Sequence, residues 1–179
     1  MAARQPVRVG RGRTLIAPID GICLHPNVVR FEAEAVLKGG TALALTLVIG
    51  NKNYSSWSFR PWIAMKAAGI PFDEVVISLD AADFKERVLK VSGTGKVPVL
   101  IDGNVRVWES LAILEYLAEK FPDAKLWPED PAARAHARAI SSEMHAGFLP
   151  LRKACPMNVW HPPKEYPQAD DVMDNVRRI

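Results

Sequence analysis

The sequence predicts an α/β domain followed by an incomplete helical domain, and three observations predict it. Residues 43–122 alternate short apolar runs with segments of helical period, in the order βαβαββα. Within them, an Asp-Gly pair separates two alternating apolar runs, the strongest short-range signal of a β-hairpin. From residue 130 onward the chain becomes alanine-rich and helix-favouring.

The first four elements are predicted to be strand, helix, strand and helix. Residues 45–49 form a β-type apolar run, and residues 57–68 carry their apolar side chains on one helical face. The β-branched residues of 72–79 favour a second strand. Asp80 is placed to cap a helix over residues 81–90. Because two strands joined through a helix need a crossover, we expect the first two strands to be parallel.

The hairpin and one further helix complete the domain. Residues 97–101 and 104–108 are the two apolar runs around Asp102 and Gly103, so we expect antiparallel strands at one edge of the sheet. Residues 111–121 follow with apolar side chains at helical spacing. The order of elements is a thioredoxin-like arrangement. The predicted fold class is therefore an α/β thioredoxin-like N-terminal domain followed by an incomplete all-α C-terminal domain.

The helical domain is predicted over residues 130–179. Asp130 is a favourable N-cap, and the helix that follows, over residues 132–154, is expected to break near Pro150. After a proline-rich loop, Asp170 could cap a last helix. The apolar stripe of that helix is unfinished at the last residue. We therefore expect the helical domain to be cut short or to depend on a partner.

Composition and charge exclude several classes of protein. The chain is 49% hydrophobic and 24% charged, which is typical of globular proteins. Its net charge of +3 comes from residues 1–41, which hold six basic and three acidic residues, while the remainder holds seventeen of each. A neutral body gives no reason to expect nucleic acid as a partner. The apolar runs are far shorter than the roughly 20 residues of a membrane-spanning helix, so no membrane partner is expected.

Residues 1–41 are expected to be a poorly structured N-terminal extension. They show no sustained period, and a transit peptide is disfavoured because the segment has no serine. Cys23 and Cys155 are far apart and form no metal-binding or redox motif, which suits a reducing, cytoplasmic location. His136 and His145 lack metal-ligand spacing, so we expect surface or packing roles and no metal site.

Ser55, Ser56 and Ser58 lie where the first predicted helix begins. The first N–H groups of a helix lack partners and its dipole is positive there, so an anion beside a serine hydroxyl would be stabilised. Serine is also among the best N-caps. Anion binding and helix capping are therefore both open for this cluster.

Three segments resemble the glutathione transferases, most closely the serine-type classes and the bacterial and zeta-like members. They are Ser-Ser-Trp-Ser-Phe-Arg at 55–60, Gly-Lys-Val-Pro-Val-Leu at 95–100 and Glu-Ser-Leu-Ala-Ile-Leu-Glu-Tyr-Leu at 109–117. The resemblance extends from residue 43 to about residue 160. It implies glutathione as the co-substrate, a small electrophile as the second substrate and a possible homodimer.

The resemblance also implies a role for each residue of the serine cluster. Ser55 would hydrogen-bond the glutathione sulfur, since it lies five residues before Arg60, as in the family. Ser56 and Trp57 would belong to the glutathione-binding residues. Ser56 and Ser58 remain possible substitutes for Ser55 or simple helix caps.

The other two segments would hold the remainder of glutathione. Val97 and Pro98 resemble the family's cis-proline corner, where the valine backbone pairs with the cysteinyl backbone of glutathione. Ser110 would take the γ-glutamyl carboxylate, and Glu109 would face the γ-glutamyl amine. Lys96 could reach the glycine carboxylate.

Three functions compete on this basis. The first is a glutathione transferase that adds the thiolate to a small electrophile. The second is an isomerase or dehalogenase that uses glutathione as its cofactor at the same site. The third is a glutathione-binding or interaction module without turnover, which the incomplete helical domain would favour.

Overall fold

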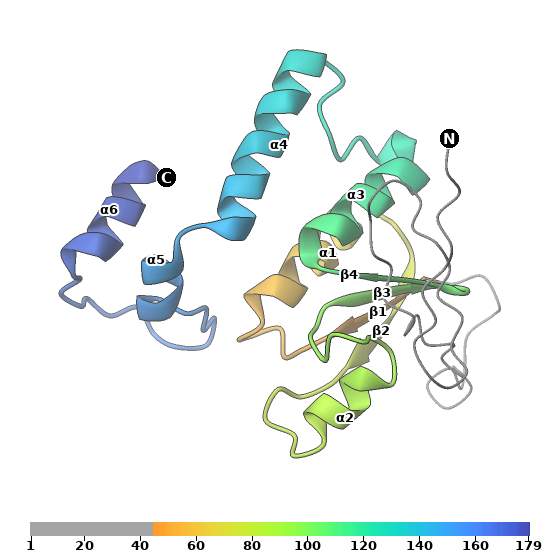
Figure 1. Cartoon of the computed structure of the whole chain (residues 1–179), viewed down its shortest axis with the longest axis horizontal. Coiled ribbons are helices and arrows are strands. Elements are labelled where there is room, and N and C mark those ends of the chain that lie inside the picture. Colours follow the sequence, from red (N-terminus) through yellow and green to blue (C-terminus); the bar gives the residue numbers. More distant parts are fainter. Residues whose placement is uncertain (1–44) are drawn as a thin grey trace, which may run out of the picture. The chain divides into compact units, whose positions relative to one another are not determined.

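The computed structural model describes residues 45–179, and the predictions for residues 1–44, among them the N-terminal extension and Cys23, lie outside this part of the chain. A four-stranded mixed sheet forms the centre of the first domain (Figure 1). Its spatial order is β2-β1-β3-β4. The strands are β1 (Leu45–Ile49), β2 (Phe72–Val76), β3 (Val99–Asp102) and β4 (Val105–Trp108).

The strand pairing confirms the predicted topology. Strand β1 is parallel to β2 and antiparallel to β3, and β3 is antiparallel to β4. Asp102 pairs with Val105, so the two turn residues are Gly103 and Asn104 and not the Asp-Gly pair itself. Gly103 has a φ of 53°, a conformation that residues with a Cβ rarely adopt, which explains why glycine occupies this position.

Helices cover both faces of the sheet (Figure 1). On one face, α1 (Ser56–Ala67) and α3 (Ser110–Lys120) enclose a core that includes Leu47, Leu100 and Ile113. On the other face, α2 (Phe84–Leu89) covers a smaller core. The smaller core consists of Val48, Ile77, Val88, Val91, Val99 and Ile101.

The segment between β2 and α2 departs from the prediction. Strand β2 ends at Val76, opposite the last residue of β1, because no partner strand continues beyond that point. The N–H of Leu79 then donates to the side-chain oxygen of Asn51 at 2.7 Å, which holds the chain in a loop. Turns follow, so α2 begins at Phe84 and the prediction of an Asp80 cap is wrong.

Three helices follow the sheet domain: α4 (Pro131–Ala146), α5 (Leu149–Ala154) and α6 (Asp170–Arg178). The predicted N-cap at the start of α4 is confirmed, since the carboxylate of Asp130 accepts the Ala133 N–H at 2.7 Å. At α6 the N-cap is Ala169 without a side-chain bond, so the predicted Asp170 cap is wrong. A short 3₁₀ turn at Pro122–Ala124 precedes these helices.

The break in the predicted long helix occurs before Pro150. Helix α4 ends at Ala146, and Phe148 adopts a φ of 63°. A Cβ on Gly147 would lie 2.9 Å from the Glu143 carbonyl oxygen, so the chain requires glycine here. Glycine therefore sets the break, and Pro150 falls in the first turn of α5, where its missing N–H costs little.

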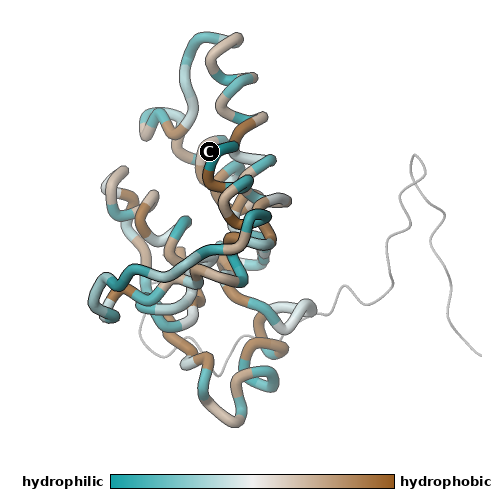
Figure 2. Tube along the Cα trace, turned by 90° about the vertical axis from the view of Figure 1, so that its left-hand side faces the viewer, coloured by the Kyte–Doolittle hydropathy of each residue, from teal (hydrophilic) through white to brown (hydrophobic). Residues whose placement is uncertain are grey.

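Apolar residues are distributed in short stretches along the described chain. Figure 2 shows brown, hydrophobic segments alternating with teal, hydrophilic ones. None of the helices within residues 45–179 combines the length and the apolar character that crossing a membrane requires.

The carboxylate of Asp102 ties the hairpin to α3. It accepts hydrogen bonds from Lys120 and, at 2.5 Å, from the Tyr116 hydroxyl. These two donors, Lys120 first, hold the pKa of Asp102 below its usual range. A carboxyl with a lowered folded-state pKa stabilises the fold above its unfolded pKa of about 3.9, and the contribution is lost as the pH falls through the folded value.

We therefore expect Asp102→Asn to lower the urea midpoint of unfolding at pH 7. The difference from the unmodified chain should begin to shrink below about pH 4, where Asp102 of the unfolded chain takes up a proton, and should be lost as the pH falls through the lowered folded-state pKa. Urea titrations of both proteins at several pH values provide the measurement. A constant difference across the acid range would contradict this account of the Asp102 contacts.

Candidate functional site

A cavity of about 290 Å³ lies between the N-terminal ends of α1 and α3 and the loop before β3. Six of the eight site residues predicted from the sequence line it, and the two that do not are Ser55 and Ser56. The lining residues are Trp57, Thr94, Lys96, Val97, Pro98, Trp108, Glu109, Ser110 and His145.

The serine cluster at the start of α1 is divided into different environments. Ser55 is the N-cap residue, but its side chain forms no capping bond. Its hydroxyl donates to Ser58 Oγ at 2.8 Å, and Ser58 Oγ also accepts the Gly50 N–H at 3.1 Å. Ser55 and Ser58 are buried. Ser56 is half-buried, and within the described chain its hydroxyl forms no hydrogen bond.

Ser58 therefore joins the end of β1 to the first turn of α1. Ser58→Ala would leave the buried Gly50 N–H without its acceptor, and an unsatisfied buried donor costs about 1–3 kcal/mol. We expect a loss of that size in the free energy of unfolding, measured by urea denaturation. Ser56→Ala is the matched control and should change stability by less than about 0.5 kcal/mol. Equal stability of both variants would show that the Ser58 link is not important to the fold.

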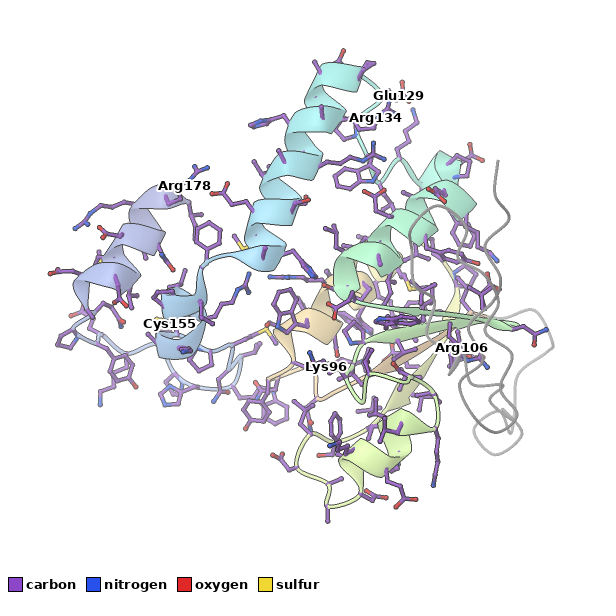
Figure 3. The ribbon with its side chains drawn as sticks, in the orientation of Figure 1. Lys96, Arg106, Glu129, Arg134, Cys155 and Arg178 are labelled. Atoms are coloured by element: carbon purple, nitrogen blue, oxygen red, sulfur yellow. The ribbon has the colours of Figure 1, made fainter. Side chains whose placement is uncertain are left out.

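The loop before β3 presents free backbone groups to the cavity. The peptide bond between Val97 and Pro98 is cis, as the resemblance implied. Among the described residues, neither the N–H nor the C=O of Val97 has a backbone partner. Lys96 is exposed on the same loop, where Figure 3 labels it, and its N–H donates to Thr94 Oγ1 at 3.3 Å. An extended ligand could therefore pair with Val97 as an added strand.

The N-terminus of α3 forms another wall of the cavity. Glu109 precedes the helix with a φ of 68°, which is unusual for a residue with a side chain and stores backbone strain. Its side chain provides no cap for the first N–H groups of the helix. Ser110, the first helical residue, is buried and lines the cavity. This end of α3 can bind an anion through its free N–H groups and its dipole.

Trp57 lies at the centre of a cluster that the sequence did not predict. The guanidinium carbons of Arg60 and Arg152 lie 4.1 and 4.6 Å from a ring centroid of Trp57. Burial, and then the charge of Arg152, lower the pKa of Arg60. His145 packs edge-on against Trp57 with ring centroids 5.1 Å apart. Arg152 and His145 come from α5 and α4, so no local sequence signal connects them with Trp57.

The loop after α5 is attached to the serine loop through Asn53. The buried side chain of Asn53 accepts the Trp160 N–H at 2.9 Å and donates to the Asn158 side chain at 3.1 Å. The Val159 N–H also donates to the backbone carbonyl of Asn53 at 3.4 Å. The proline-rich segment predicted only as a loop thus holds the chain two residues before Ser55.

Cys155 and His136 lie away from the cavity lining. Cys155 is an exposed, free thiol at the end of α5, labelled in Figure 3. His136 is exposed on α4. A second cavity, of about 630 Å³ and mainly apolar, lies between α1, α3 and α4 and shares Ser110 and His145 with the first.

Comparison with known proteins identifies the sheet domain. The profile of the family "Glutathione S-transferase, N-terminal domain" matches residues 54–120. A probable maleylacetoacetate isomerase of Caenorhabditis elegans is 41% identical over 98 residues, which are 54% of this chain and 45% of the relative. A zeta-class glutathione S-transferase of Euphorbia esula is 32% identical over 105 residues, 58% of this chain and 47% of the relative.

A solved structure supports the same assignment. The crystal structure of a glutathione transferase homolog from Burkholderia, with bound glutathione, is 30% identical, with a TM-score of 0.52. The match covers 62% of this chain and 58% of that one. The chain spans about half the length of the curated relatives it matches. Residues 54–120 therefore match the N-terminal domain of glutathione S-transferases, and the fold of the chain is similar to that of a solved glutathione transferase homolog.

Proposed function

We propose that this chain binds glutathione in the 290 Å³ cavity and activates its thiol for addition to a small electrophile. The observation that carries the proposal is the convergence of three sequence-distant segments on one cavity, each with chemistry that suits one part of glutathione. The segments are the start of α1, the loop before β3 and the start of α3. The bound glutathione of the Burkholderia relative supports the choice of ligand.

In this proposal the γ-glutamyl end of glutathione lies at the start of α3. Its carboxylate accepts from the Ser110 hydroxyl and the first helical N–H groups, and its ammonium faces Glu109. The cysteinyl backbone pairs with the free N–H and C=O of Val97. The exposed Lys96 neutralises the glycine carboxylate.

Ser55 is the proposed thiol activator. A free thiol has a pKa near 8.5. A hydrogen bond to a charged acceptor is worth roughly 1.5–3 kcal/mol, and a helix N-terminus roughly 0.3–1 kcal/mol. At about 1.36 kcal/mol per pKa unit, the two together lower the thiol pKa by roughly one to three units. No general base is then needed, because the thiolate is already present at neutral pH.

The Ser55 hydroxyl must turn for this role. It donates inward to Ser58 in the structure, so binding of the thiolate requires the hydroxyl to rotate towards the cavity. Ser56, with a hydroxyl that has no partner among the described residues, is the competing donor. Ser58 is a poor candidate because it is buried and already accepts two hydrogen bonds.

Two reactions fit an activated thiolate. In a transferase reaction, a carbon–sulfur bond forms while the bond to a leaving group breaks and that group departs with the electron pair, or, in an addition to a double bond, the resulting carbanion takes up a proton. In an isomerase reaction, the thiolate adds to a conjugated double bond, the adduct rotates, and the thiolate leaves unchanged. The isomerase alternative is supported by the likeness to the Caenorhabditis elegans relative. Dehalogenation and glutathione binding without turnover remain further alternatives.

The test is turnover with glutathione and two substrates. A chloro-dinitrobenzene reports conjugation through consumption of glutathione, and maleylacetoacetate reports isomerisation with glutathione regenerated. Conjugation alone would support the transferase, and isomerisation at catalytic glutathione concentrations would support the isomerase. Glutathione binding without either reaction would reduce the proposal to a binding module. A homodimer and a cytoplasmic location stay predictions.

A further inference from the structure

His145 belongs to the wall of the proposed glutathione cavity although it comes from α4, outside the three motifs at 55–60, 95–100 and 109–117. Its ring packs edge-on against Trp57, with centroids 5.1 Å apart. Its Nδ1 atom is buried and has no hydrogen-bond partner among residues 45–179. The ring is therefore fixed by packing, and its other nitrogen, Nε2, is the one available to the cavity.

The atom that Nε2 approaches is a carboxylate oxygen of Glu109, at 3.4 Å. The Glu109 side chain is 52% exposed, and within residues 45–179 it forms no other ion pair. Glutamate is a flexible side chain that loses much rotamer freedom when it is ordered. Without His145, the carboxylate would have to be ordered by the ligand alone.

A carboxylate can accept from both partners at once. Its two oxygens offer about four lone-pair sites, and the 3.4 Å contact with His145 Nε2 is at Oε2 of Glu109. Oε1 remains free for the γ-glutamyl ammonium. The unusual φ of 68° fixes the direction in which the Glu109 side chain leaves the backbone, and the contact with His145 then fixes its far end.

We propose that His145 is a positioning residue that orients the Glu109 carboxylate towards the α-amino group of the γ-glutamyl residue of glutathione, and thereby selects ligands that carry this group. The inference rests on the proposed function, because it assigns a task within the same cavity. It gives the helices after the sheet domain a part in recognising glutathione itself.

The experiment compares two ligands by titration calorimetry. One is glutathione, and the other is glutaryl-cysteinylglycine, which lacks only the α-amino group of the γ-glutamyl residue. His145→Phe keeps a ring against Trp57 but removes the donor. We expect it to weaken glutathione binding about 5- to 10-fold and binding of the analogue less than about 2-fold. His145→Gln retains an N–H donor near the position of Nε2 and should restore most of the affinity for glutathione.

His136→Phe is the matched control, because it makes the same substitution at an exposed position of α4. It should leave both affinities unchanged. His145→Ala replaces the phenylalanine variant if that variant does not fold. An equal loss for both ligands, or no loss for either, would overturn the positioning role while leaving glutathione binding intact. If the unmodified chain does not bind glutathione, the proposed function fails, and this inference fails with it.

Discussion

Replacing Ser55 with alanine is expected to raise the pKa of the bound glutathione thiol by about one to two units and to lower kcat/KM about 10- to 100-fold. The physical reason is the loss of a hydrogen bond to a charged sulfur, worth roughly 1.5–3 kcal/mol. The thiolate absorbance of bound glutathione, followed across pH, measures the first effect. Steady-state turnover with the chloro-dinitrobenzene measures the second.

Two controls separate chemistry from folding in the Ser55 variant. S-methylglutathione has no thiol to ionise, so its dissociation constant should be the same for the Ser55→Ala variant and the unmodified chain. Ser56→Ala removes the neighbouring hydroxyl and should leave the thiol pKa unchanged. If the Ser56 variant loses thiol ionisation while the Ser55 variant keeps it, the role passes to Ser56.

Ser110→Ala is expected to raise the dissociation constant of glutathione about 10- to 100-fold, because the γ-glutamyl carboxylate would lose a hydrogen bond to a charged acceptor. Stability should hardly change, since the Ser110 side chain forms no hydrogen bond within the described chain and Ser110 is not the N-cap of α3. Calorimetry with glutathione measures the affinity, and thermal unfolding without ligand measures the stability.

The exposed Ser142 on α4 supplies the control for this substitution. Ser142→Ala should alter neither the affinity nor the stability. Unchanged affinity in the Ser110 variant would contradict the placement of the γ-glutamyl carboxylate at the start of α3. A large drop in thermal stability would show instead that the Ser110 hydroxyl has a structural task.

The sheet and its flanking helices could be predicted from the sequence because their signals are local. Strand β1 is a largely apolar segment in which all five residues are buried, and the hairpin has its turn residues between two alternating runs. The N-cap at Asp130 also depends only on neighbouring residues. In each case the residues that determine the strand, turn or helix cap lie within the same short stretch of the sequence.

The start of α2 was predicted wrongly because it depends on a distant residue. Asn51 holds the Leu79 N–H across 28 positions, which delays the start of α2. The break near Pro150 was predicted, but its position depends on Gly147, where a Cβ would lie 2.9 Å from the Glu143 carbonyl oxygen. Helix propensity gives no warning of the Asn51 contact, because tertiary structure decides it.

The candidate site also combines residues with local sequence signals and residues placed only by tertiary contacts. Residues 96–98 and 109–110 stand in recognisable segments, and the structure brings them to one cavity. His145 has no such segment, since its contact with Glu109 joins two helices through tertiary packing. The sequence leaves the choice among the three serines open, and it does not display the hydrogen bonds that tie Ser58 to Gly50 and Ser55.

The most direct test of the central claim is calorimetric titration of the chain with glutathione, followed by the ultraviolet absorbance of the bound thiolate across pH. The account predicts saturable binding, with one glutathione per chain and a thiol pKa roughly one to three units below the free value near 8.5. A folded sample that does not bind glutathione, or that binds it with an unchanged thiol pKa, would contradict the account.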